Sequence, residues 1–171
     1  MTYKMIIDTD PGVDDALAIA YACLHPEIEL IGLTTIFGNV SVDQSTVNAG
    51  YLLDLLDHQH VPVAKGASVP LKQKPHSFPD FVHGKNGFGD IQVQYPADFK
   101  PHELSAADFI VEQINKHPGE IVLVPVGPLT NIALALQKDP SIAHKVKQVV
   151  IMGGAAFVEG NVSPAAEANL W

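Results

Sequence analysis

Cysteine, positive charge and long apolar runs are all scarce in this sequence of 171 residues. The single cysteine, Cys23, excludes a disulfide within the chain and favours a reducing compartment. Ten basic residues against 19 acidic ones give a net charge of −9, which argues against a nucleic-acid or membrane-surface partner. No apolar run approaches the roughly 20 residues of a membrane helix, and the N-terminus turns acidic too early for a signal peptide. The sequence therefore predicts a cytoplasmic protein.

Short apolar runs alternate along the chain with longer helical patterns. Runs rich in Val, Ile and Leu are typical of a parallel sheet covered on both faces. The expected fold is α/β, an open doubly wound, mainly parallel sheet in one domain spanning 1–171, incomplete at its C-terminus. The apolar helix at 16–24 is expected to be buried, and Ser41 and Ser105 are expected to be N-caps of two later helices. The predicted strands are 3–7, 29–37, 61–66, 120–127 and 146–154, and the predicted helices are 16–24, 41–56, 105–119 and 128–137.

Residues 67–100 show no clean period and are rich in proline, glycine and lysine. A connection of this length without its own structure is uncommon in a compact domain and is often functional. We expect this segment to be an active-site loop or lid.

Polar and small residues follow the predicted strands where each strand ends. Four aspartates follow the first strand, and Gly38 and Asn39 follow the second. In open parallel sheets, ligands bind beyond the carboxyl ends of the strands. The sequence therefore predicts a shared site at this edge. Later strand ends contribute 125–128, then Gly153 and Gly154, and after them Asn161, Glu167 and Asn169.

The four aspartates, Asp8, Asp10, Asp14 and Asp15, lie within eight positions. Two like charges about 4 Å apart repel by roughly 4 kcal/mol at an effective dielectric near 20. A helix N-terminus favours anions and accounts for one or two of the four. A divalent cation with oxygen ligands accounts for the rest.

Two known acidic patterns share features with this stretch. An EF-hand loop starting at Asp8 would need glycine where Val13 stands and glutamate where Ile19 stands, so it fails. A phosphatase that forms an aspartyl-phosphate would use Asp8 as nucleophile and Asp10 as acid/base. Gly12 departs from that pattern, but the phosphatase stays open as an alternative.

The segment DTDPGVDDALA resembles the N-terminal signature of the calcium-dependent nucleoside hydrolases, the inosine-uridine preferring type. The resemblance extends over essentially the whole chain. Further segments similar to the family, in the same order, are GN at 38–39, HGKNGFGD at 83–90, GPLTNIALAL at 127–136, VIMGGA at 150–155 and GNVSPAAEAN at 160–169.

The resemblance implies a Ca²⁺ site and a catalytic base. Asp10 would be a calcium ligand and would take a proton from the attacking water. Asp15 and the backbone carbonyl of Val126 would be further calcium ligands, and Asp8 would support them from behind.

The resemblance also implies a nucleoside site. Asp14 would accept a hydrogen bond from the ribose 2′-hydroxyl, Asn39 would lie near the ribose, and His83 would lie in a loop over the nucleoside. The remaining ribose contacts would come from Asn161, Glu167 and Asn169.

The expected function is hydrolysis of the N-glycosidic bond of purine or pyrimidine nucleosides by a calcium-bound water, in nucleoside salvage. The resemblance implies a homodimer or homotetramer. Family members continue beyond the matched segment, where they supply another calcium-binding aspartate and a histidine. We therefore expect this chain to be C-terminally truncated relative to the family, and a non-catalytic remnant is a further alternative.

Overall fold

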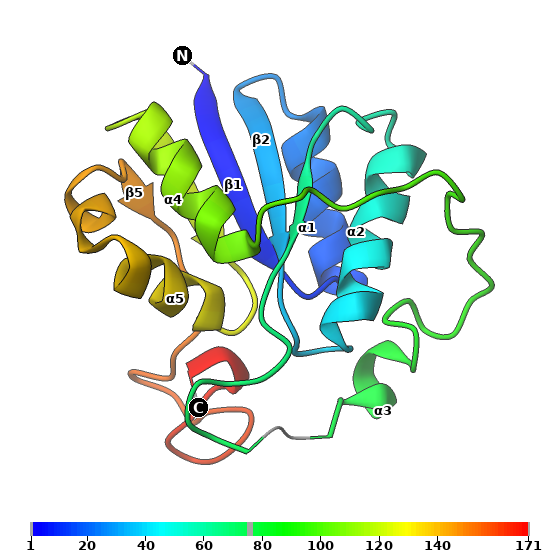
Figure 1. Ribbon diagram of the computed structural model, residues 1–171. Coiled ribbons are helices and arrows are strands. Elements are labelled where there is room, and N and C mark those ends of the chain that lie inside the picture. The colour runs from blue at the N-terminus through cyan, green and yellow to red at the C-terminus, as the bar shows by residue number, and fades with distance from the viewer. Residues whose placement is uncertain (1, 75–76, 171) are drawn as a thin grey trace.

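The computed structural model describes residues 2–74 and 77–170 and contains one parallel sheet (Figure 1). Its strand order is β3-β2-β1-β4-β5, and each pairing between neighbours is parallel. The prediction of an open, mainly parallel α/β sheet is confirmed. The strands are β1 (Tyr3–Thr9), β2 (Ile28–Thr35), β3 (Val63–Lys65), β4 (Ile121–Pro125) and β5 (Gln148–Val149).

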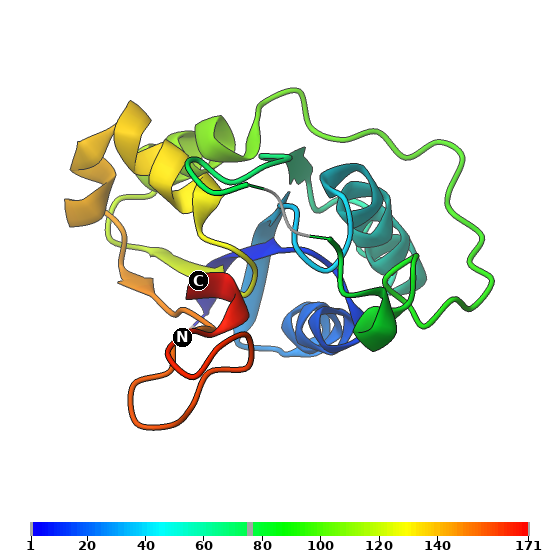
Figure 2. The same cartoon turned by 90° about the horizontal axis from the view of Figure 1, so that it is seen from below.

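The first strand, β1, is central, and its last residues lie beside the ends of both neighbours. Asp8 pairs with Thr34 of β2 on one side and with Pro125 of β4 on the other. The order of the strands reverses at β1, because β2 and β3 extend to one side of it and β4 and β5 extend to the other. This is the point at which open α/β sheets bind ligands. Figure 2 faces these carboxyl ends.

Helices cover both faces of the sheet. Alternate residues of β1 point to opposite faces. Ile7 packs into a core shared with α1 and α2, and Ile6 packs into a core shared with α4 and α5. Figures 1 and 2 both show these two layers. The helices are α1 (Val13–Leu24), α2 (Val42–Leu55), α3 (Asp80–His83), α4 (Ala106–Lys116) and α5 (Thr130–Lys138), with 3-10 turns at Pro140–His144 and Ala168–Leu170.

Two helix starts follow directly from the local sequence. Ser41 precedes α2, and its side chain accepts a hydrogen bond from the backbone nitrogen of Gln44. Ser105 precedes α4 and accepts one from the nitrogen of Asp108. A serine in this position satisfies a backbone donor that the helix itself leaves free. Both N-caps were expected from the sequence.

The structure differs from the sequence-based expectation at three elements. The regular part of β5 is only Gln148–Val149, although Val150 and Met152 still donate to backbone oxygens of β4. The helix α1 is not buried all round, because Leu17 and Tyr21 on its outer face are exposed. The 67–100 segment is mostly irregular but contains α3, and residues 75–76 within it lie outside the described residues. No helix of the described part is long and apolar enough to cross a membrane.

Candidate active site at the β1–α1 turn

The turn from β1 into α1 buries an aspartate at each of its ends. Asp10 follows the end of β1, and Asp15 lies in the first turn of α1; each side chain is only 4% exposed. Asp15 Oδ1 accepts from the Thr9 hydroxyl at 2.6 Å, and its Oδ2 accepts from the Gly12 backbone nitrogen at 3.1 Å. The helix N-terminus supplies unpaired N–H groups that favour a carboxylate. Asp15 therefore caps its own helix while lying beside Asp10.

Asn39, which follows β2, connects the two buried aspartates. Its backbone nitrogen donates to Asp10 Oδ2 at 2.6 Å. Its side-chain Nδ2 donates to Asp15 Oδ2 at 3.1 Å and to the Asp10 backbone oxygen at 3.2 Å. The structure thus brings together Asp10, Asp15 and Asn39, as the sequence predicted from the ends of the first two strands.

Two glycines enclose the Asp10 carboxylate. A Cβ atom on Gly38 would lie 2.0 Å from Asp10 Oδ2, and one on Gly127 would lie 2.6 Å from Oδ1. Any side chain at either position would therefore displace the carboxylate. The glycines at these strand ends allow the backbone to approach the acid from both sides.

Asp10 opens into a cavity of about 360 Å³ at the carboxyl edge of the sheet. Asn39 and Asn169 also line it, and its apolar wall includes Phe37 and Phe78. A mostly apolar cavity with a few convergent polar groups is typical of a small-molecule site. The remaining lining residues are Gly38, Ser68, Pro70, Ser77, Pro79, Pro128, Val162 and Ala168.

Burial is the main cause of the raised pKa values in this cluster. It raises the pKa of Asp10 well above the ordinary value, and the negative charge of Asp15 raises it further. Burial also raises the pKa of Asp15, although hydrogen bonds from Thr9 and Gly12 oppose the shift. Of the charged groups nearby, His83 opposes the raised pKa of Asp15, but no ion pair among the described residues is formed by either buried acid.

Asp8 lies behind the cavity and is completely buried. Its Oδ1 accepts from the Thr34 hydroxyl and, at 2.8 Å, from Asn131 Nδ2. Its Oδ2 has no hydrogen-bond partner among the described residues. Burial raises the pKa of Asp8 to about 7. Asp8 is not among the residues that line the cavity.

Asp14 and His83 form an outer rim. The Asp14 side chain is 67% exposed, and its Oδ1 lies 3.7 Å from Nδ1 of His83. His83 belongs to α3, and its Nδ1 accepts from the Val13 backbone nitrogen at 3.4 Å. A Cβ on Gly12 would lie 2.8 Å from that nitrogen, so the ring packs against the β1–α1 turn. The structure therefore places His83 next to the acidic turn.

The C-terminal part reaches the site mainly through Asn169. Its Nδ2 donates to the backbone oxygens of Val126 at 2.9 Å and of Met152 at 3.1 Å. Glu167 Oε2 accepts from the nitrogens of Gly154 and Asn169, so it braces this segment. Asn161 Oδ1 accepts from the Ala168 nitrogen at 3.0 Å and is likewise engaged with its own segment. Of the three predicted ribose contacts here, Asn169 alone lines the cavity.

The donor atoms at this site are of the type that a hard cation prefers. Their number is smaller than the coordination number of such an ion. Asp10, Asp15 and the Val126 carbonyl supply oxygen, the donor that Ca²⁺ prefers in sets of six to eight. The Val126 oxygen already accepts from Asn169. Among residues 2–74 and 77–170, no group of three or more His, Cys, Asp or Glu side chains is placed to hold a metal ion. Water or substrate hydroxyls would have to complete the set.

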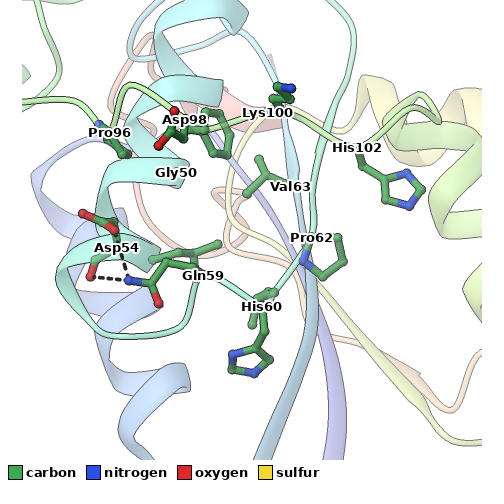
Figure 3. A pocket seen from close by; sticks show the side chains of 13 residues that line it. Gly50, Asp54, Gln59, His60, Pro62, Val63, Pro96, Asp98, Lys100 and His102 are labelled. Atoms are coloured by element: carbon green, nitrogen blue, oxygen red, sulfur yellow. Dashed lines mark hydrogen bonds between the residues drawn. The ribbon is translucent and has the colours of Figure 1, made fainter.

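A larger cavity, of about 420 Å³, is lined by none of the four clustered aspartates, and Figure 3 shows the side chains around it. Its buried apolar lining residues are Leu53, Val61 and Val63. On its rim, Gln59 Nε2 donates to Asp54 Oδ1 at 3.0 Å, so these two polar groups satisfy each other. No buried carboxylate lines it, and we therefore place the candidate site at the smaller cavity.

The sequence reasoning assigned no role to three residues that hold the site together. Thr9 and Thr34 donate their hydroxyls to Asp15 and Asp8. Asn131 lies inside the GPLTN segment and donates to Asp8. A hydroxyl or amide within an otherwise apolar strand or helix was the available signal, because a buried polar side chain needs a partner.

Comparison with known proteins gives consistent results. Residues 5–171 match the model of the family described as inosine-uridine preferring nucleoside hydrolase. Uridine nucleosidase 1 of Arabidopsis thaliana is 52% identical over 168 residues, which are 98% of this chain and 50% of that protein. The inosine-uridine preferring nucleoside hydrolase of Leishmania major is 43% identical, across 100% of this chain and 54% of that protein.

Solved structures agree. A plant nucleoside hydrolase superposes with a TM-score of 0.95 at 46% identity, over 99% of this chain and 53% of its own. A purine-preferring ribonucleoside hydrolase from Gardnerella vaginalis gives a TM-score of 0.93 at 44% identity, over 97% of this chain and 53% of its own. The chain thus spans about half the length of these relatives. The resemblance seen in the sequence is confirmed, and the chain belongs to the inosine-uridine preferring nucleoside hydrolase family.

Proposed function

We propose that this chain carries the metal- and ribose-binding part of a ribonucleoside hydrolase, which cleaves the N-glycosidic bond with water to give ribose and a free base. One observation carries the proposal. A buried carboxylate, Asp10, enters a cavity beside Asn39 and Asn169, and Asp15 lies next to it through the Asn39 amide. Relatives matched along nearly the whole of this chain are named as a uridine nucleosidase and as an inosine-uridine preferring nucleoside hydrolase. Assembly as a dimer or tetramer, and a cytoplasmic role in nucleoside salvage, belong to the same proposal.

Asp10 is the base in this reaction. A carboxyl group whose pKa is raised by burial and by Asp15 is a stronger proton acceptor once ionised. Asn39 fixes one of its oxygens, and the enclosing glycines leave it little room to turn. Asp10 can therefore take a proton from a water molecule that attacks the anomeric carbon of the ribose.

The surrounding polar groups suit the charge that develops on the sugar. Cleavage of a glycosidic bond passes through an oxocarbenium-like ribosyl cation. Carboxylates and amide oxygens near that carbon stabilise it. Asp14 on the rim and Asn169 in the cavity would hold ribose hydroxyls, with Asn161 and Glu167 supporting the segment that presents Asn169. The apolar wall that includes Phe37 and Phe78 is available to the base.

Calcium would be held by Asp10, Asp15 and the Val126 carbonyl, and when bound it would balance the two carboxylates and lower the pKa of a nearby water. The raised pKa values of Asp10 and Asp15 support a cation here, because a positive ion would stabilise both carboxylates in their ionised form.

The phosphatase alternative needs Asp8 as a nucleophile. That side chain is completely buried, and its Oδ1 already accepts two hydrogen bonds. A nucleophile must reach the phosphorus atom of its substrate. The structure therefore favours Asp10 over Asp8 as the reacting carboxylate. Asp8→Asn would abolish phosphoryl transfer but only perturb a hydrolase, whereas Asp10→Asn would disable both.

The experiment is ribose release. The folded 171-residue chain is incubated with uridine and with inosine, in calcium or in chelator, and reducing sugar is measured. We expect calcium-dependent release that Asp10→Asn reduces by at least about 100-fold. Asp43→Asn is the matched control, because that aspartate is exposed, pairs with Lys65 and is not among the residues that line the cavity. Absence of release from well-folded protein would reject activity for this chain and leave the non-catalytic remnant.

A further inference from the structure

Two fully buried asparagines, Asn48 and Asn131, lie outside the set of residues to which the proposed function gives a role. They come from α2 and α5, helices on opposite faces of the sheet. Each one hydrogen-bonds both to the aspartate-bearing segment 8–11 and to the segment 67–100, which we call the site loop. A buried amide is costly unless its partners are all present, so such contacts fix the groups they join.

Asn131 joins three segments of the chain at the start of the site loop, through one side chain and two backbone groups. Its Nδ2 donates to Asp8 Oδ1 at 2.8 Å and to the Thr35 backbone oxygen at 2.9 Å. Its Oδ1 accepts from the Ala67 nitrogen at 2.9 Å. The ends of β1 and β2 and the first residue of the site loop are thus held by one side chain.

The backbone just before Ala67 also packs closely against Asn131. A Cβ on Gly66 would lie 2.3 Å from Asn131 Oδ1 and 2.4 Å from Nδ2, so the backbone leaving β3 lies directly against this amide. Ser68 and Pro70, which follow at once, line the cavity that contains Asp10. The position of this cavity wall therefore depends on Asn131.

Asn48 forms a similar set of contacts at a second point, within the site loop. Its Nδ2 donates to the Pro11 backbone oxygen at 3.0 Å and to the Asn86 backbone oxygen at 2.9 Å. Its Oδ1 accepts from Gln44 Nε2 and from the Tyr95 hydroxyl. His83 lies three residues before Asn86 and contacts the same β1–α1 turn.

We propose that Asn131 and Asn48 are positioning residues that fix two anchor points of the site loop, Ala67 at its start and Asn86 within it, to the aspartate-bearing segment 8–11. Through Ala67 the first asparagine places Ser68 and Pro70, and through Asn86 the second places His83. The anchoring follows from the contacts alone, whereas its effect on nucleoside binding rests on the proposed function.

Amide hydrogen exchange, followed by NMR without substrate, tests the anchor at Ala67. In Asn131→Leu we expect the Ala67 amide to exchange at least about tenfold faster, since a lost hydrogen bond exposes it to local opening. The Ile36 amide, which donates to the Thr9 oxygen, reports opening of the sheet itself. Thr34→Val is the matched control, because it removes the other donor to Asp8 and leaves Ala67 bonded. If Asn131→Leu fails to fold, Asn131→Ala makes the same comparison without added bulk.

A second set of variants tests the anchor point at Asn86. Asn48→Leu should speed exchange in residues 86–90 and leave Ala67 unchanged. Thr46→Val, a buried change on the same helix at a hydroxyl that bonds to Thr35 and Val42, should change neither exchange rate. Equal acceleration at Ala67, Ile36 and 86–90 in either asparagine variant would show a general loss of stability and would overturn the proposal.

Kinetics separate positioning from a merely structural role. Both asparagine variants should raise KM for the nucleoside by about tenfold with little change in kcat, because the chemistry at Asp10 is intact. Asp10→Asn should lower kcat instead. A fall in kcat with unchanged KM in the asparagine variants would count against positioning. Should no variant release ribose, the proposed function fails, and the exchange comparison still decides the anchoring.

Discussion

The backbone nitrogen of Asn39 lies 2.6 Å from Oδ2 of Asp10, donating a hydrogen bond to it. The bond joins the loop after β2 to the residue that follows β1, so these two loops hold one acid in a fixed orientation. The side chain of Asn39 reaches past Asp10 to Asp15 at the same time. Asn39 thus holds two carboxyl groups close together. Removing its side chain should lower the stability of the fold.

Asn39→Leu keeps the backbone donor to Asp10 and removes the amide that Asp15 Oδ2 accepts from. A buried carboxylate that loses a donor costs about 1–3 kcal/mol. We expect the free energy of unfolding, measured in urea at pH 7, to fall by about that amount. Asn115→Leu, an exposed change on α4, should cost less than about 1 kcal/mol. Equal losses in both variants would show that the Asn39–Asp15 contact carries no weight.

The metal-free protein should lose stability as the pH rises from about 4 to about 7. Asp8 binds its proton more tightly in the folded state, where its pKa is about 7, than in the unfolded state, near 3.8. Between these values the folded state holds a proton that the unfolded state has released, so rising pH favours unfolding, by about 4 kcal/mol across the window. Asp10 and Asp15 shift in the same direction. The pKa values of Asp108 and Asp139 are lowered instead, so these two groups change the stability only at pH values below that window.

Urea unfolding in chelator at several pH values measures this slope. Asp8→Asn should flatten it, because asparagine keeps the oxygen that accepts from Thr34 and Asn131 and carries no titrating proton. A wild-type stability that rises between pH 5 and pH 7 would contradict the raised pKa values.

Calcium should stabilise the folded chain at pH 7. A ligand at 100 times its dissociation constant adds about 2.7 kcal/mol to the free energy of unfolding. We expect thermal unfolding to shift upward with calcium in the wild type and to be unchanged in Asp10→Asn and Asp15→Asn. Asp43→Asn should respond as the wild type does, since it lies on the exposed start of α2. A calcium shift of equal size in all four proteins would place the ion elsewhere.

Gly38→Ala should disable the site while leaving the fold. The added Cβ would lie 2.0 Å from Asp10 Oδ2 and 3.1 Å from Cδ of Pro128, so the carboxylate must move. A displacement near 1 Å at a reacting group can cost about 100-fold in rate, and we expect that loss in ribose release. Gly119→Asn is the control, because nothing lies within 4 Å of that position and asparagine tolerates its positive φ. A full-rate Gly38→Ala protein would show that Asp10 is not the base.

The sequence predicted most of what depends on neighbours along the chain. Ser41 and Ser105 were recognised as caps because a cap bonds to a residue three positions on. Asp10 and Asn39 were placed together because parallel strands end at one edge. Asn131 was missed because its partner Asp8 lies 123 positions away, and no local pattern records that contact. The exposure of Leu17 was not predicted, because the sequence of a helix does not show whether another element covers its apolar residues.

That exposed face of α1 gives a last prediction. Leu17, Tyr21 and Leu24 are 71%, 63% and 68% exposed and recur at helical spacing, so they form one apolar stripe on the outer surface. Contiguous apolar surface of this kind promotes association in water. We expect the wild-type chain to show a mass that rises with concentration in analytical ultracentrifugation, and Leu17→Glu to remove most of that rise. Leu55→Glu places the same charge at an equally open leucine of α2, outside the stripe, and should leave the association intact. If both substitutions reduce association equally, added charge rather than the α1 stripe governs it, because only Leu17 belongs to the stripe.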